Sequence, residues 1–173
     1  QLISGWLVTG KNEQTGLVSV ITDLYRMPKT MGQLAIVQFF SWFALFAMWI
    51  YTTSAVTSNI YGTTDTASVE YNKGANWVSG LFAIYSGCAA LVAFLLPVLA
   101  KVTSRKWTHA ICLITGGISL ISISFVRTPT ALIFPMIGIG VAWASILSMP
   151  YAILTGSLPH NKIGGYMGSF NFV

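Results

Sequence analysis

The sequence predicts an all-α membrane protein with four transmembrane helices and the start of a fifth. Its composition supports this fold class, because only 8% of the residues are charged, 54% are hydrophobic and the mean hydropathy is +0.71. A soluble domain carries roughly 25% charged residues. A bilayer crossing needs about 20 apolar residues, and four runs approach or exceed that length, at 31–56, 77–100, 110–126 and 131–156.

The fourth run, 131–156, differs from a simple membrane anchor. It has no charged residue, yet it contains two serines together with Trp143, Pro150 and Tyr151. A polar solute that crosses a membrane must meet hydrogen-bonding groups and aromatic faces on its way. This mixture therefore favours a helix that lines a path for a solute.

The first run also has a polar and aromatic face. Helical spacing places five of its residues on that face, namely Gln38, Trp42, Leu45, Trp49 and Thr52. An amide inside a membrane either bonds to a neighbouring helix or faces a solute, and both interpretations remain open here. Trp49 and Trp77 are predicted to lie in the aromatic belts at the membrane surface.

Small residues predict where the helices approach one another. The second run carries a stripe of them, which predicts close packing on that face: Gly80, Ala83, Gly87 and Ala90. The short connection 127–130 predicts that the third and fourth runs are antiparallel neighbours. A fifth helix is expected over 164–173, where Gly164 and Gly168 have the spacing of a helix-packing motif.

The basic residues predict the orientation of the helices. Seven of the nine lie within 11–29, 101–106 and at 162, which the alternation of spans places on one side, whereas only Lys73 and Arg127 lie on the other. The positive-inside rule makes the first side the cytoplasm, for a multi-pass protein of the cell membrane. We expect 1–30 to be a cytoplasmic loop. Its segment 17–27 has the pattern of an interfacial amphipathic helix or, alternatively, of an ordinary loop helix, and both ends of the sequence indicate a piece of a longer chain.

The sequence offers no constellation for catalysis, cofactor binding or metal binding. His109 and His160 fall at predicted loop positions, where a histidine is usually solvated, and no acidic residue falls inside a predicted span. Cys88 and Cys112 fall inside apolar runs, which favours packing over a disulfide or a metal site. No basic run with interleaved aromatic residues is present, so a nucleic-acid partner is not expected either.

Several short motifs resemble those of a transporter family. The turn Ser104-Arg105-Lys106 is similar to the signature loop of the major facilitator superfamily, although the acidic residue and the glycine of that loop are missing. From Met27 onward the chain resembles the C-terminal half of sugar carriers in the sucrose-transporter group, the glycoside–pentoside–hexuronide type of cation symporter. The matching motifs are Met-Pro-Lys-Thr-Met at 27–31, Ser-Trp-Phe-Ala-Leu-Phe at 41–46, Tyr61-Gly62, Ser-Met-Pro-Tyr-Ala at 148–152, and Met167-Gly168 with Asn171.

The resemblance implies that 31–173 is a partial C-terminal bundle, comprising helices seven to ten and the start of eleven of a twelve-helix fold. It implies symport of a neutral di- or oligosaccharide, such as sucrose or maltose, with a cation that is usually a proton, by alternating access. The partners would be the sugar, the cation, the lipid bilayer and the N-terminal half of the same chain. Plant carriers have aspartates at the end of helix seven, where this sequence has Thr52-Thr53-Ser54, so either the coupling acid lies in the missing half or the coupling differs.

Uncharged groups at membrane depth are the predicted contacts for the sugar. The substrate-binding candidates are Gln38, Trp42, Tyr85, Trp143, Ser145 and Tyr151, although the serines of the fourth run can instead bond the carbonyl four residues back. Pro150 kinks its helix and serves either as a gate hinge or as a static bend. A carrier for a nucleoside or a drug, and a membrane scaffold without transport activity, remain the alternatives. An intramembrane enzyme ranks last because no acid lies at depth.

Overall fold

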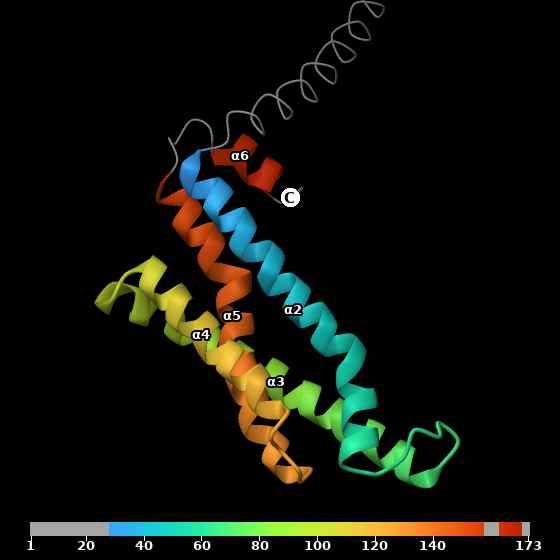
Figure 1. Ribbon diagram of the computed structural model, residues 1–173. Coiled ribbons are helices and arrows are strands. Elements are labelled where there is room, and N and C mark those ends of the chain that lie inside the picture. Colours follow the sequence, from blue (N-terminus) through green and yellow to red (C-terminus); the bar gives the residue numbers. More distant parts are fainter. Residues whose placement is uncertain (1–27, 158–162, 171–173) are drawn as a thin grey trace, which may run out of the picture. The chain divides into compact units, whose positions relative to one another are not determined.

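The computed structural model describes residues 28–157 and 163–170 (Figure 1). The interfacial helix predicted over 17–27, together with His160 and Lys162, lies outside the described residues. Contacts divide the chain into two compact units, of which one is Gln38–Ile153 and the other combines Gln1–Val37 with Leu154–Val173. The candidate site lies in the larger unit, Gln38–Ile153.

Every described helix agrees with the predicted fold class. Four helices within the described part of the chain are long and apolar enough to cross a membrane, which supports a multi-pass membrane protein. They are α2 (Lys29–Asn59), α3 (Val69–Val102), α4 (Arg105–Ile123) and α5 (Ile133–Thr155), the last preceded by the 3-10 turn η1 (Thr130–Leu132). A short helix, α6 (Ile163–Phe170), follows where the fifth was expected, and there Gly164 and Gly168 are exposed.

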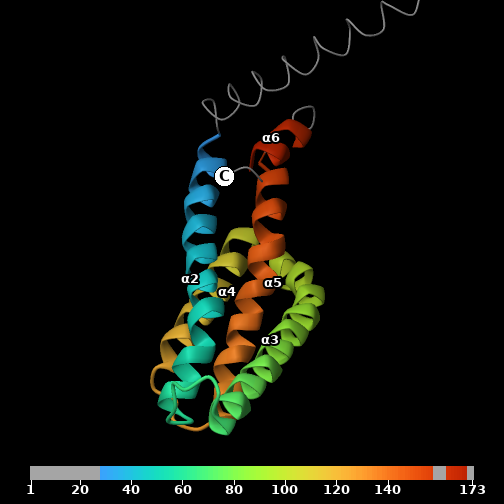
Figure 2. The ribbon, with the colours of Figure 1, turned by 90° about the vertical axis from the view of Figure 1, so that its right-hand side faces the viewer.

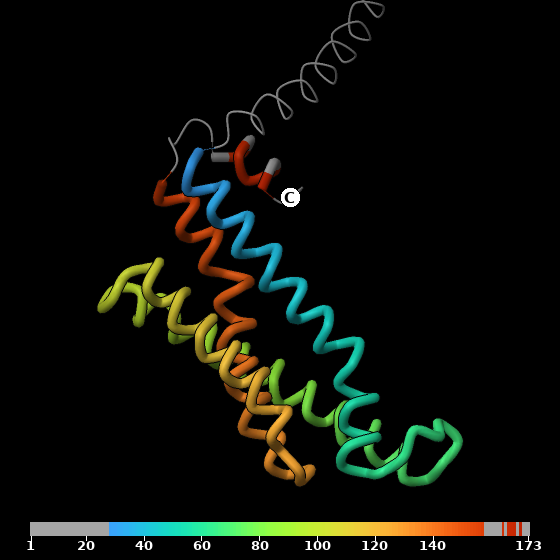
Figure 3. Tube along the Cα trace, in the orientation of Figure 1, coloured from blue at the N-terminus to red at the C-terminus, as the bar shows by residue number. Residues whose placement is uncertain are grey.

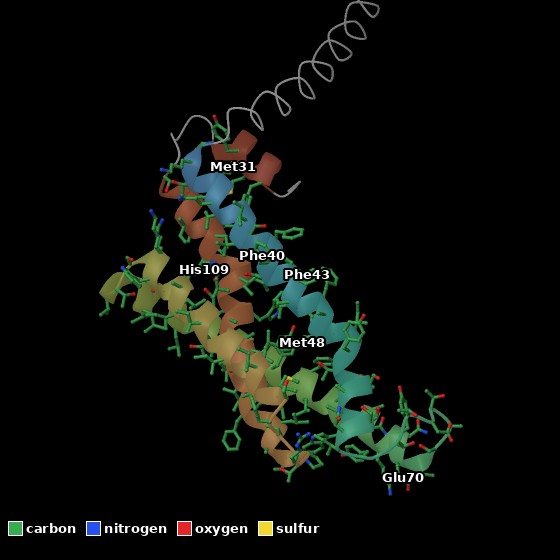
Figure 4. The ribbon with its side chains drawn as sticks, viewed as in Figure 1. Met31, Phe40, Phe43, Met48, Glu70 and His109 are labelled. Atoms are coloured by element: carbon green, nitrogen blue, oxygen red, sulfur yellow. The ribbon has the colours of Figure 1, made fainter. Side chains whose placement is uncertain are left out.

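The second helix is longer than the sequence predicts. The second apolar run begins at residue 77, but α3 already begins at Val69 because Ser68 caps it. The Ser68 hydroxyl oxygen accepts a hydrogen bond from the backbone N–H of Tyr71 at 3.1 Å, as N-cap serines do. Glu70 therefore lies in the first turn of a spanning helix, where it is exposed at the end of α3 (Figure 4).

The basic turn expected between the second and third spans is mostly helical. Only Thr103 and Ser104 separate α3 from α4, and the Ser104 hydroxyl oxygen accepts a hydrogen bond from the N–H of Trp107 at 3.3 Å. Arg105 and Lys106 are exposed residues of the first turn of α4. The motif that resembles a signature loop is thus an N-cap followed by a basic first turn.

Helix α5 is the helix against which the others in the larger unit pack, and Figures 2 and 3 show α2, α3 and α4 beside it. Helix α4 runs antiparallel to α5, as predicted, because Gly116 meets Ala142 and Gly138 meets Ser119 further along. Helix α3 approaches α5 at Gly140, where an added Cβ would lie 2.6 Å from the carbonyl oxygen of Tyr85. Small residues of α4 and α5 therefore set the close contacts.

The predicted small-residue stripe on α3 is not a helix contact in the described structure. Gly80 and Gly87 are exposed, and an added Cβ at either position would meet no heavy atom within 4 Å. Helix α3 instead packs through its larger side chains, which are buried along another face: Val78, Leu81, Tyr85, Ala89 and Leu96. The prediction of close packing at this stripe is therefore wrong for the described residues, because the stripe lies on an exposed face of α3.

Candidate functional site

Gln38 of α2 makes a polar contact with α5 that depends on Pro150. A proline has no backbone N–H, so the carbonyl of Ile146, four residues earlier, loses its helical partner. The Gln38 side-chain nitrogen Nε2 donates to that carbonyl oxygen at 3.3 Å. In a membrane no water can satisfy such a carbonyl, so the amide replaces the missing hydrogen bond. Of the two interpretations left open for Gln38, its nitrogen follows the interhelical one.

The oxygen of the Gln38 amide makes no comparable contact. This oxygen, Oε1, is buried and has no hydrogen-bond partner among the described residues. An amide oxygen can accept two hydrogen bonds, so Gln38 holds a vacant acceptor beside α5. Pro150, which creates the need for the contact, is itself fully buried inside α5.

Three of the predicted substrate contacts lie together in an aromatic cluster, which consists of Trp42, Phe46 and Trp49 of α2, Tyr85 of α3 and Trp143 of α5. The ring centroids of Trp143 lie 5.4 Å from Trp42 and 5.5 Å from Trp49, and both pairs are edge to face. Tyr85 lies 6.4 Å from Trp143 and is buried, whereas the three indoles are only half-buried. Edge-to-face packing stabilises such a cluster and leaves ring surface uncovered.

The two tryptophans predicted to lie in interfacial belts both have tertiary partners. Trp49 belongs to the aromatic cluster through Trp42 and Trp143. Trp77 is half-buried, and its indole Nε1 donates to the carbonyl oxygen of Pro129 at 2.8 Å, which fastens α3 to the segment before η1. Both tryptophans therefore also connect segments that are far apart in the sequence, and their place in a membrane belt stays a prediction.

His109 is not the solvated loop residue that the sequence suggested. It lies in the second turn of α4, is only 4% exposed, and its ring nitrogen Nδ1 is 2.8 Å from the hydroxyl oxygen of Ser145. Its other nitrogen, Nε2, is buried without a hydrogen-bond partner in the described part of the chain. Ser145 is fully buried, so we assign its hydroxyl to this contact between α4 and α5 and not to the alternative bond with its own helix.

A histidine bonded to a serine invites comparison with a hydrolase, but the geometry does not favour one. A nucleophilic serine must reach its substrate, and a third group usually orients the imidazole. Here Ser145 is enclosed, and the third side chain of the group is the buried thiol of Cys112, beside Ser145. Within 28–157 and 163–170, no three His, Cys, Asp or Glu side chains are grouped as metal ligands would be.

The remaining predicted residues lie toward the end of α5. Arg105 donates from its guanidinium to the carbonyl oxygen of Ala152 in the last turn of α5. The Ser148 hydroxyl bonds the Ala144 carbonyl four residues back at 2.7 Å, as the alternative interpretation held. Tyr151 is 36% exposed and lies about two turns beyond Trp143.

Two cavities open in the larger unit, and neither contains a predicted substrate contact. An apolar one of about 200 Å³ lies between α2, α4 and α5, lined in part by Leu45, Gly116 and Ile146. A more polar one of about 360 Å³ lies at the other end, where Asn59 and Arg127 line it. The indoles of the aromatic cluster are partly exposed and line neither of these two cavities.

Comparison of the chain with protein families, with curated proteins and with solved structures gave no match. What the geometry offers is an uncharged surface of indole rings, one helical turn from an amide with a vacant acceptor. Such a surface suits a neutral solute that has both flat apolar faces and hydroxyl groups.

Proposed function

We propose that this chain is part of a cation-coupled secondary carrier that moves a neutral di- or oligosaccharide, such as sucrose or maltose, by alternating access. The observation that carries the proposal is the half-exposed aromatic cluster beside the buried, vacant oxygen of Gln38. The resemblance of the helix-seven and helix-ten motifs to sugar carriers, from the sequence alone, points in the same direction.

The chemistry of a sugar matches this surface. The C–H faces of a pyranose ring stack on indoles such as Trp42 and Trp143, and its hydroxyl groups donate to an acceptor such as Gln38 Oε1. Neither the cluster nor Gln38 carries a charge, so a neutral solute loses less hydration energy there than an ionic one. The carrier performs no covalent chemistry on the sugar.

Alternating access requires a helix that can change its shape near the binding surface. Helix α5 has such a point at Pro150, where the Ile146 carbonyl is bonded by α2 and not by its own helix. In the proposed orientation, Pro150, Tyr151 and the bond from Arg105 to α5 lie toward the cytoplasm, and Trp143 lies nearer mid-membrane. Tyr151 and Pro150 then belong to the cytoplasmic gate, and Trp143 to the sugar site.

A nucleoside is the second solute that the aromatic cluster favours. A nucleobase is flat and uncharged, and it stacks on indoles as well as a sugar does. Competition between the two solutes tests whether both bind at this surface. A hydroxyl-rich glucoside and a nucleoside such as uridine would displace each other only if they shared it.

Uptake by vesicles that contain the full-length protein tests the proposal. Labelled sucrose or maltose is expected to accumulate when a proton gradient, acidic outside, is imposed, and to equilibrate slowly without it. Unlabelled uridine in large excess serves as the competitor, and labelled uridine is assayed for uptake in parallel. Uptake of no glucoside under either condition would contradict the sugar proposal, and uptake of uridine instead would support the second candidate.

A further inference from the structure

His109 has one ring nitrogen more than its structural contact needs. The bond between Nδ1 and Ser145 Oγ holds α4 to α5, and an asparagine amide could make the same bond. The Nε2 atom contributes nothing to that contact, yet it is buried without a partner among the described residues, which costs free energy. A buried polar atom that serves no structural purpose is a strong indication of a binding role.

The side chains that pack at the Ser145 side of His109 are uncharged, and the nearest charges are Arg105 and Lys106 one turn earlier in α4. Helix α5 presents Ser145 to it, and α4 adds the thiol of Cys112 in the next turn. Helix α3 contributes the apolar side chains that pack around that thiol, Ala89 and Leu96. Helix α2 has one ionisable residue in this unit, Tyr51, which lies more than three turns beyond Gln38.

No carboxylate compensates a charge on the imidazole. The acidic residues of the described part of the chain are Asp65 and Glu70, in the loop before α3 and in its first turn, far along the helix from the end that joins α4. A protonated imidazole in this closed setting would be an unpaired buried charge. The ring is therefore neutral when enclosed, and it takes up a proton only in a conformation that admits water.

We propose that His109 is the site at which the carrier binds its coupling proton, an inference that rests on the proposed transport function. The Nε2 lone pair takes a proton from hydronium and leaves water, while Nδ1–H donates to Ser145 Oγ in both states. On release the proton returns to water and the ring is neutral again. This assigns to a histidine the role for which the sequence shows no acid.

The position of His109 also selects the side on which the proton leaves. Arg105 and Lys106 lie one turn before it, at the end of α4 that the charge pattern predicts to be cytoplasmic. Positive charges nearby disfavour the protonated ring. Opening toward these residues therefore releases the proton into the cytoplasm, which is the direction that proton-driven uptake requires (Figure 4 marks His109 on α4).

The test uses the full-length carrier in proteoliposomes, with His109→Asn and two readouts. Counterflow of labelled maltose against internal maltose needs no net proton movement, and we expect the variant to retain it. Accumulation driven by a proton gradient should fall at least tenfold, and the proton uptake that maltose triggers, read with a pH-sensitive dye, should disappear. Unaltered proton uptake in His109→Asn would overturn the proposal while leaving the transport function intact.

A second variant decides the matter if His109→Asn does not fold. Ser145→Ala removes the oxygen that accepts from the protonated ring, a charge-assisted bond, so the pH profile of accumulation should move toward lower pH. Ser148→Ala is the matched control, because its hydroxyl bonds only within α5. An unchanged profile in Ser145→Ala would overturn the proposal. Absence of counterflow in the wild-type protein would contradict the proposed function itself, and this inference with it.

Discussion

The side of α5 that meets α2 and the side that meets α4 each carry a buried polar contact, and the two contacts lie one residue apart. On the α2 side, the Gln38 nitrogen replaces a hydrogen bond that Pro150 removes from the Ile146 carbonyl. On the α4 side, Ser145 bonds one nitrogen of His109 and leaves the other without a partner. Each contact also leaves one buried atom without a partner among the described residues, Gln38 Oε1 on the first side and His109 Nε2 on the second, but only the first contact replaces a hydrogen bond that a proline removes.

The two sides also differ in how closely the helices approach. Small residues bring α4 against α5, since Gly116 meets Ala142 and Gly138 meets Ser119. The α2 side is held by the large rings of the aromatic cluster, whose indoles stay half-exposed, and the apolar cavity of about 200 Å³ remains between the helices. The α4 side of α5 is a tight helix contact, whereas the α2 side exposes ring surface to a solute.

The largest loss of stability is expected from overpacking the contact between α4 and α5. Gly116→Leu forces a side chain into Ala142, and overpacking of this kind costs about 3 kcal/mol or more when backbones must separate. Gly117→Leu is the matched control, because a Cβ at Gly117 meets nothing within 4 Å and the residue lines the cavity. Thermal unfolding of the purified full-length protein measures both. Equal losses of stability in the two variants would contradict the proposed geometry of the α4–α5 contact.

The contact between α4 and α5 shows what the sequence could and could not predict. The sequence predicted four spans and the antiparallel pairing of α4 with α5, because apolar length and a short connection determine them. It could not tell which small residues face a neighbour, so it selected Gly80 and Gly87 on α3, which are exposed. Tertiary packing decides which side of a helix faces a neighbour. Each apolar run is apolar on several sides, so its pattern does not select one of them.

A smaller loss of stability is expected from removing one ring of the aromatic cluster. Trp143→Ala should lower stability by about 2 kcal/mol, less than for a fully buried tryptophan, because the side chain is only partly buried. Phe94→Ala is the control, since Phe94 is 81% exposed on α3. Chemical unfolding in detergent compares the two. A loss no greater for Trp143 than for Phe94 would show that the aromatic cluster does not hold α2, α3 and α5 together.

The smallest loss of stability is expected from removing the hydrogen bond that Gln38 donates. Gln38→Leu should cost about 1 kcal/mol, typical of hydrogen bonds between membrane helices. In a Pro150→Ala background the restored N–H can bond the Ile146 carbonyl, so the same change should cost almost nothing. A double-mutant cycle on unfolding free energies measures this coupling. Strict additivity would mean that Gln38 does not replace the missing bond, and unaltered transport rates in Pro150→Ala would favour a static bend over a gate hinge.

The candidate site was predictable by residue type and not by role. Gln38, Trp42, Tyr85 and Trp143 were selected as unusual side chains in apolar runs, and three of them meet in the aromatic cluster. His109 was set aside because it precedes the third apolar run, although α4 begins five residues earlier than that run. The N-cap Ser104 was the signal that could have corrected this boundary.

Sugar binding at the aromatic cluster is tested most directly by tryptophan fluorescence of the purified full-length protein during titration with maltose and sucrose. The proposal predicts a saturable change with at least one of these sugars. It also predicts that Trp143→Phe, which keeps most of the packing but loses ring area, weakens the apparent affinity by about tenfold. No saturable change with either sugar, or an affinity identical in the wild-type protein and in Trp143→Phe, would contradict it.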